Sequence, residues 1–317
     1  MRQQPFFNKK FKIIFPAFLI LVPALLITLS SNSNAKFNEV YLIKINDDTI
    51  NPVTADYIIN SIDKAGQVNA ECLIIELDTP GGLLSSTRLI VKKISQAKIP
   101  VVVYVYPAGS RAGSAGVFIT YASHIAAMAP ATNIGAAHPV KMGGGGRSLW
   151  DALRDLIDSF SNQEKQTRQK ESSESDVMAD KVLQDSLAFI RALAEERNRN
   201  SSWAEKSVVE SASITAEEAR KIGVIEIIAK DELELLRQLN ERTVKIGGKT
   251  KTLNTRGAVI NYITMTPRER ILNVLANPNI AYILMILGFY GLFFEITHPG
   301  IGFPGIAGTI CLILAFF

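Results

Sequence analysis

The sequence predicts an α/β fold built on a parallel sheet, with an apolar segment at each end of the chain. Apolar strand-like runs alternate with helix-like stretches from residue 39 to residue 129. The strand-like runs are apolar almost throughout, which is typical of parallel strands that helices cover on both faces. The two end segments have the composition of helices that enter a bilayer.

The alternation is clearest in the first half of the central region. Strands are expected at residues 39–45, 72–77, 101–106 and 125–129, and helices at 53–64, 83–97 and 114–123. Crossovers between parallel strands should be right-handed.

The pattern changes after residue 139. A glycine run at 143–146, a short amphipathic helix at 149–160 and a polar stretch at 161–176 form a flexible insert over 141–176. This insert is either a lid or entry loop for a site, or an untethered surface loop. Beyond it we expect helices at 177–196, 216–221 (capped by Ser213 or Thr215) and 231–239, a strand at 224–229, and a β-hairpin over 245–259 that turns at Gly247-Gly248.

The N-terminal end has the organisation of a secretory signal over residues 1–35. Basic residues including Arg2 and Lys12 precede an apolar run at 13–29, and Ser33-Asn34-Ala35 offers a small-residue cleavage site. The run is long for a signal, so an uncleaved anchor is the alternative. Either arrangement exports the chain from Lys36 onward, because the positive flank stays inside.

The C-terminal end predicts a transmembrane helical hairpin within residues 277–317. Two apolar stretches at 280–294 and 301–317 are separated by a short polar segment. Buried core helices are the alternative, and Arg268 and Arg270 lie on the side that the positive-inside rule disfavours. The chain stops inside the second apolar stretch and looks truncated. Residues 36–265 are sufficient for one sizeable α/β domain.

Composition argues against several classes of function. The formal net charge is +4, and no basic stripe is interleaved with aromatic residues, so nucleic-acid binding is not indicated. Cys72 is expected in a buried strand and Cys311 in the membrane, which rules out a disulfide framework. Three scattered histidines and two unpaired cysteines do not form a metal site.

Two glycine-containing turns follow neighbouring strands and indicate a catalytic site. Ser114 stands between small residues where a strand turns into a helix, at the positive end of the helix dipole. The segment 77–82 ends another strand with a turn that frees backbone N–H groups. Because the carboxyl ends of parallel strands form the sites of such sheets, the two turns together indicate a serine nucleophile and an oxyanion hole.

These motifs, with several downstream, resemble the NfeD family: membrane-bound serine proteases of the Clp-protease/crotonase superfamily that are linked to stomatin-like proteins. The resemblance covers about residues 40–317 and implies a Clp/crotonase-like parallel-sheet domain. The family often carries more membrane spans and a small C-terminal β-barrel domain, and this chain ends before either. The motifs lie at residues 78–82, 110–116, 129–136, 192–200, 217–219, 223–225 and 299–305.

The resemblance implies a serine–lysine dyad. The serine maps to Ser114 and the lysine to Lys181, near the start of the helix that precedes residues 192–200. Lys181 must be neutral to accept the hydroxyl proton, which requires a site shielded from water. The oxyanion would be held by the main-chain N–H groups of Gly82 and Ala115, helped by Gly81.

His138 offers an alternative base. Its spacing from Ser114 is similar to that of the histidine in soluble Clp proteases, which use a Ser-His-Asp triad. Asp78 or Asp180 would supply the acid. Histidine suits general-base catalysis near neutral pH because of its proton affinity.

The sequence therefore predicts a serine endopeptidase on the extracytoplasmic side of the cell membrane, acting through an acyl-enzyme without metal or cofactor. The resemblance implies hydrophobic protein segments as substrates, a stomatin-like membrane protein as partner, and a homo-oligomer, dimer or larger, that completes the cleft. A non-proteolytic membrane organiser that binds stomatin-like proteins is the alternative. Acyl-CoA chemistry on the same fold is disfavoured, because an exported domain meets no CoA.

Overall fold

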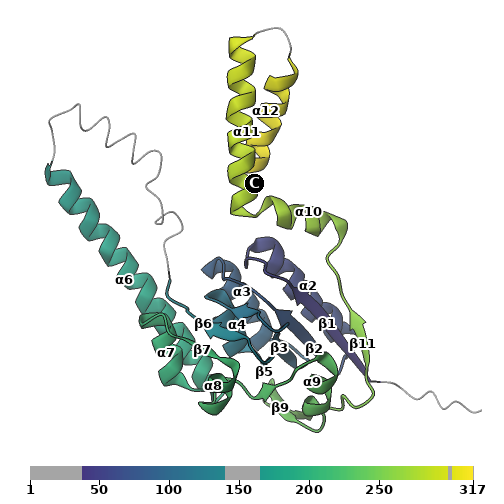
Figure 1. Ribbon diagram of the computed structural model, residues 1–317. Coiled ribbons are helices and arrows are strands. Elements are labelled where there is room, and N and C mark those ends of the chain that lie inside the picture. Colours follow the sequence, from purple (N-terminus) through teal and green to yellow (C-terminus); the bar gives the residue numbers. More distant parts are fainter. Residues whose placement is uncertain (1–37, 140–164, 299–301, 317) are drawn as a thin grey trace, which may run out of the picture. The chain divides into compact units, whose positions relative to one another are not determined.

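A computed structural model describes residues 38–139, 165–298 and 302–316, with side chains from residue 177 onward in the long helix α6. Its centre is a six-stranded sheet (Figure 1). The strand order is β11 (Val259–Tyr262), β1 (Glu39–Ile45), β2 (Cys72–Leu77), β3 (Val101–Val105), β5 (Ile125–Met128) and β8 (Ile227–Ile228). Every neighbouring pair in this sheet is parallel, which confirms the expected sheet. The predicted signal segment, the helix at 149–160 and most of the insert lie outside the described residues.

The expected alternation is present in the first half of the domain, with boundaries displaced by a few residues at most. The strands are β1 (Glu39–Ile45), β2 (Cys72–Leu77), β3 (Val101–Val105) and β5 (Ile125–Met128), and the helices are α2 (Pro52–Gln67), α3 (Leu84–Ser95) and α4 (Ala115–Ala122).

The strands are apolar because both faces of the sheet are buried. Alternate residues such as Ile75 and Val103 face one core together with α2, α3 and α4. Their neighbours Ile74 and Val102 face a second core, where they meet α9 (Glu232–Leu239). Successive side chains of a strand point to opposite faces, so a strand buried on both sides is apolar at every position.

The expected hairpin at 245–259 is shorter than predicted. Strands β9 (Thr243–Ile246) and β10 (Lys249–Thr252) pair around Gly247-Gly248, and both glycines have positive φ. Val259 begins a separate strand, β11 (Val259–Tyr262), which lies parallel to β1 at the edge of the main sheet. Pairing with a partner more than 200 residues away leaves no local pattern in the sequence.

Several short elements were not predicted. Strands β4 (Arg111–Ala112), β6 (Asn133–Gly135) and β7 (Ser213–Thr215) form a small second sheet, and α7 (Ser201–Val209) precedes β7. Strands of two or three residues are too short to show a period. The predicted strand at 224–229 is reduced to β8 (Ile227–Ile228).

The long helix α6 (Lys165–Glu196) begins twelve residues before its predicted start at 177. The added residues are rich in Glu, Lys, Gln and Arg, which are strong helix formers, so a packed helix extends readily through them. Helix α8 (Ala216–Lys221) begins as expected at Thr215, whose hydroxyl and backbone form a capping box with Glu218.

The C-terminal apolar stretches form the expected pair of helices, α11 (Pro278–Thr297) and α12 (Phe303–Ala315). Helix α11 is long and apolar enough to cross a membrane. The helices pack closely at glycines: a Cβ on Gly291 would lie 2.9 Å from the Gly308 Cα atom. Small residues permit such close approach between membrane helices. Helix α10 (Pro267–Leu275) connects this pair to the sheet domain.

His124 is a part-buried residue between α4 and β5. Its Nδ1 atom accepts a hydrogen bond from the Val101 N–H at 3.1 Å, which requires a neutral ring. Burial, together with the charges of Arg197 and Arg199, lowers the pKa of His124 from 6.5 to about 3. The native state therefore resists protonation of this ring.

We expect His124→Asn to weaken the dependence of stability on acid. Between pH 6.5 and 3 the unfolded state binds a proton at His124 that the native state does not, so stability falls as pH falls through this window. Asparagine keeps a hydrogen-bond acceptor but cannot titrate. In guanidinium unfolding of the detergent-solubilised chain, the variant should lose less stability between these pH values, by up to about 1.4 kcal/mol per pH unit. Equal slopes in the two proteins would contradict this role for His124.

Candidate active site

A cavity of about 470 Å³ opens between the turn that follows β2 and the turn that begins α4. Both turns lie at the carboxyl ends of parallel strands, where sites form in such sheets. The cavity brings together Ser114, Gly81, Gly82, Ala115 and His138, all of which the sequence indicated. Most of its other lining residues are apolar: Pro80, Leu83, Leu84, Phe118, Ala137, Pro139 and Val182, with Thr87 and Ser186.

Ser114 occupies the N-cap position of α4 in an unusual backbone conformation. Its φ of 45° and ψ of −105° lie outside the regions that L-residues prefer, so the turn stores strain of about 1–3 kcal/mol. Its N–H donates to the Ala136 carbonyl at 2.6 Å, and its carbonyl accepts from the Val117 N–H. The hydroxyl does not cap the helix and has no hydrogen-bond partner among the described residues. It is therefore available to a substrate.

The two turns touch through glycines. Gly81 has a φ of +129°, and a Cβ atom there would lie 2.6 Å from the Ser114 Cβ. A Cβ on Gly113 would lie 2.7 Å from the Pro80 carbonyl oxygen. The Gly113 N–H donates a hydrogen bond to the Thr79 carbonyl, so the two turns are also joined by a backbone hydrogen bond. Side chains at these glycines would push the serine away from the neighbouring turn.

Gly82 and Ala115 each carry an N–H group with no hydrogen-bond partner among the described residues, and both residues line the cavity. Two such donors beside a serine hydroxyl are the components of an oxyanion hole. Gly81 does not give the help expected of its N–H group. Its N–H donates to the Thr79 hydroxyl at 3.1 Å, so Gly81 supplies space and not a donor.

His138 lies in the same cavity and is oriented by the main chain. Its Nδ1 is 2.8 Å from the Val208 carbonyl oxygen, and because a carbonyl can only accept, Nδ1 must donate. This leaves Nε2 as the nitrogen that can take a proton. Asp78 accepts a hydrogen bond from the Arg111 N–H and does not bond to the histidine ring, so it does not form the acid member of a triad here.

Lys181 is not among the residues that line the cavity. It is exposed on α6, next to Val182, which does line the cavity. The helix is held over α3 and α4 by a stack between Phe118 and Phe189 and by an ion pair between Arg88 and Asp185. The described residues therefore leave the Lys181 side chain open to water.

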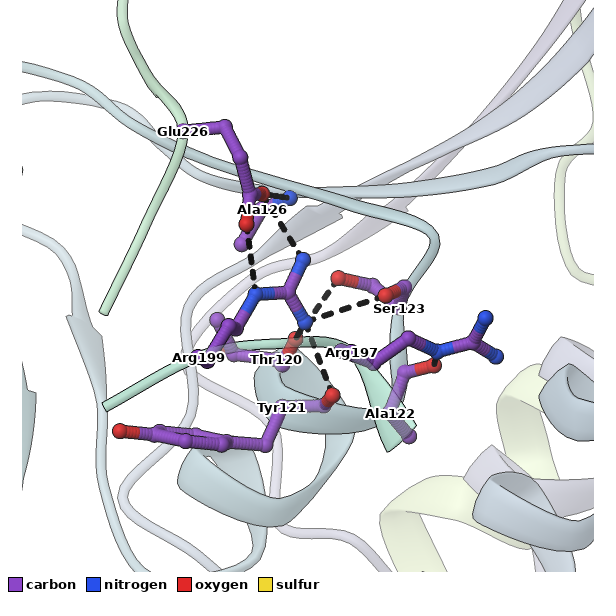
Figure 2. A network of polar contacts seen from close by, with 8 residues as sticks. All are labelled: Thr120, Tyr121, Ala122, Ser123, Ala126, Arg197, Arg199 and Glu226. Carbon is purple, nitrogen blue, oxygen red and sulfur yellow. Dashed lines mark hydrogen bonds and ion pairs between the residues drawn. The ribbon is translucent and has the colours of Figure 1, made fainter. Parts of the chain in front are cut away.

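A buried arginine fixes the opposite end of the serine helix. The Arg199 Nη1 atom donates to three carbonyls at the C-terminus of α4 at 2.8–3.0 Å, those of Thr120, Tyr121 and Ser123 (Figure 2). The Arg199 Nε and Nη2 atoms each donate to Glu226 at 2.8 Å. The arginine thereby satisfies carbonyls that the end of the helix leaves free, and its charge complements the helix dipole.

The Arg199 cluster extends to neighbouring chain segments. Glu226 also accepts from the Ala126 N–H at 2.6 Å, which connects the pair to β5. Arg197 donates to the Ala122 carbonyl at 2.9 Å (Figure 2). Residues 192–200 belong to one of the family-like motifs of the sequence, but the role of Arg199 depends on backbone carbonyls of a distant helix. No sequence pattern reveals such partners.

Comparison with known proteins places the chain. The family model described as the N-terminal domain of NfeD1b matches residues 39–248, and that of the NfeD integral membrane domain matches 279–317. The chain belongs to the NfeD family. It is a membrane protein, since the family's membrane domain coincides with the apolar helices α11 and α12.

Two curated relatives cover most of this chain. Membrane-bound protease PH1510 of Pyrococcus horikoshii is 36% identical over 299 residues, which are 94% of this chain and 62% of that protein. Membrane protein NfeD1b of Bacillus subtilis is 28% identical over 290 residues, which are 90% of this chain and 57% of that protein. The chain thus spans about six-tenths of the length of these relatives.

Two solved structures of the membrane-bound stomatin-specific protease 1510-N share this fold. A lysine-to-alanine mutant in complex with a substrate peptide matches with a TM-score of 0.61 and 35% identity, over 76% of this chain and 98% of that one. A serine-to-alanine mutant matches with a TM-score of 0.60 and 36% identity, over 73% of this chain and 99% of that one.

We expect Arg199→Ala to destabilise the protein by about 3–5 kcal/mol, because the substitution leaves helix-end carbonyls and the Glu226 carboxylate without their donor. Arg199→Lys should also lose stability, since an ammonium group cannot reproduce the planar, forked contact. The matched control is Arg191→Ala, which removes an exposed ion pair with Glu205. Its denaturation midpoint should lie close to that of the wild type. Equal denaturation midpoints for Arg199→Ala and Arg191→Ala would show that the cluster does not hold the helix.

Proposed function

We propose that this NfeD protein is a membrane-anchored serine endopeptidase with Ser114 as its nucleophile. The observation that carries the proposal is the arrangement in one cavity of the Ser114 hydroxyl and the N–H groups of Gly82 and Ala115. None of the three has a hydrogen-bond partner among the described residues. The relative PH1510 is named a membrane-bound protease, and serine and lysine mutants of 1510-N were chosen for structure determination. Both facts support the same assignment.

The proposed reaction proceeds through an acyl-enzyme. Ser114 Oγ attacks the scissile carbonyl carbon while a base removes its proton, and the resulting oxyanion accepts hydrogen bonds from the Gly82 and Ala115 N–H groups. When the tetrahedral intermediate collapses, the C–N bond breaks and the protonated base returns the proton to the leaving amine. Water then attacks the ester, assisted by the same base, and releases Ser114.

Lys181 is the proposed base, and His138 is the alternative. The lysine mutant of 1510-N in complex with a substrate peptide supports a lysine. Lys181 is exposed in the single chain, as are Val177 and Met178 on the same helix. A bound apolar substrate, or a second copy of the chain, would cover this part of α6 and remove water from the lysine. Such cover would favour the neutral amine that the reaction requires.

The proposed substrates are hydrophobic protein segments. The side chains of Leu83, Leu84, Phe118 and Val182 give the cavity an apolar lining, which suits an apolar peptide. The name of 1510-N states that it is stomatin-specific, and we extend this to a stomatin-like membrane protein as partner or substrate. The anchor places the protease domain on the extracytoplasmic side in this proposal.

We expect Ser114→Ala and Lys181→Ala to abolish cleavage of an apolar-rich peptide library, each by at least about 10³-fold in kcat/KM. His138→Ala should retain activity within a few-fold. The assay uses the full chain in detergent or liposomes, and Lys206→Ala is the control, because that lysine lies on α7 and not in the cavity.

The outcomes separate the alternatives. Loss with Ser114→Ala and His138→Ala, but not with Lys181→Ala, would move the base to the histidine. Activity that persists in Ser114→Ala would overturn the proposal. Absence of cleavage by the wild type, together with capture of a stomatin-like protein by both wild type and Ser114→Ala, would favour a non-proteolytic organiser.

A further inference from the structure

Asn273 on helix α10 contacts the segment between β1 and α2. Its Oδ1 accepts from Asn51 Nδ2 at 2.8 Å and from the Thr54 hydroxyl at 3.3 Å. Its Nδ2 donates to the Asp48 carboxylate at 3.2 Å. Asn51 is itself buried and caps α2 by accepting from the Thr54 N–H. One amide side chain thus satisfies a donor and an acceptor on the segment 48–51 at the same time.

The same segment holds the turn that carries Gly82. The Ile50 N–H donates to the Gly81 carbonyl at 2.8 Å, and the Ile50 carbonyl accepts from the Leu83 N–H at 2.8 Å. The Asp48 carbonyl accepts from the Thr79 hydroxyl at 2.7 Å. A Cβ atom on Gly82 would lie only 2.2 Å from the Ile50 carbonyl oxygen. The position of Gly82 is therefore set directly by residues 48–51.

Helix α10 is the element from which the membrane-spanning helix continues. It ends at Leu275, and α11 begins at Pro278. The apolar side chains of Ile271 and Val274 on this helix are exposed. Within the described part of the chain, Asn273 is the α10 side chain that hydrogen-bonds to the sheet domain. An unbroken series of contacts thus runs from the start of the membrane helix to an N–H group of the oxyanion hole.

We propose that Asn273 is a positioning residue for the oxyanion turn, through which the helix leading into the membrane sets the geometry opposite Ser114. The inference rests on the proposed function, since the turn matters for catalysis only if Gly82 binds an oxyanion. Asn273 does not touch substrate. It acts on the reaction by fixing residues 48–51, and these fix the Gly82 N–H.

The test exchanges donor and acceptor between the two partners. Asn273→Asp keeps the acceptor for Asn51 but places a carboxylate against Asp48, which should release the segment. In the double variant that combines Asn273→Asp with Asp48→Asn, the amide at position 48 donates to the carboxylate at position 273, which restores a hydrogen bond between the two positions. Arg268→Ala, on an exposed residue of α10, is the control. All variants are made in the full chain, and thermal unfolding is recorded for each.

The first readout, amide hydrogen exchange of peptides that contain Ile50 and Leu83, does not depend on activity. We expect faster exchange of both in Asn273→Asp, with the wild-type rate restored in the exchanged pair and unchanged in Arg268→Ala. Where cleavage is measurable, kcat should fall about tenfold with KM unchanged. This fall is smaller than the ~10²–10³-fold fall in rate that follows the complete loss of one oxyanion-hole donor. Equal exchange at Ile50 and Leu83 in wild type and Asn273→Asp overturns the inference, whatever the activity. Failure of the proposed function shows separately, as a wild type without Ser114-dependent cleavage.

Discussion

The structure depends on a contact between two backbone turns that only glycine permits. Gly81 lies so close to Ser114 that a methyl group would collide with the serine Cβ, and Gly113 meets the Pro80 carbonyl in the same way. This contact brings Ser114 of one turn and Gly82 of the other to the same cavity, and the Gly82 N–H has no partner among the described residues. A parallel sheet is suited to it, because adjacent strands deliver both turns to the same edge.

Each of the two turns is supported by a polar side chain that does not line the cavity. Arg199 fixes the C-terminal end of α4 and so supports the strained conformation of Ser114 at the N-terminal end. On the other side, the segment 48–51 bonds to the glycine turn and is in turn bonded by Asn273. Hydrogen bonds thus converge on both turns, and the proposed reaction needs its groups held to within a fraction of an ångström.

The sequence was informative where local chemistry determines structure. Near-continuous apolar runs that alternate with helix-like stretches predicted β1, β2, β3 and β5. The two turns pointed to Ser114, Gly82 and Ala115, which line one cavity. It failed where partners are distant. The pairing of β11 with β1 and the bonds of Asn273 connect residues more than 200 positions apart. The N–H of Gly81 was misassigned because its partner is a hydroxyl whose rotamer no sequence reveals. Lys181 stays a prediction that depends on what covers α6.

The most direct test of Ser114 as the nucleophile is to map the adduct of a fluorophosphonate probe on the full chain in membranes by mass spectrometry. The phosphonyl group reacts with an activated serine, and its oxygen takes the place of the oxyanion. We expect one adduct, on the peptide that contains Ser114, and none in Ser114→Ala. An adduct on another serine, or a wild type that cleaves peptides while Ser114 stays unmodified, would contradict it.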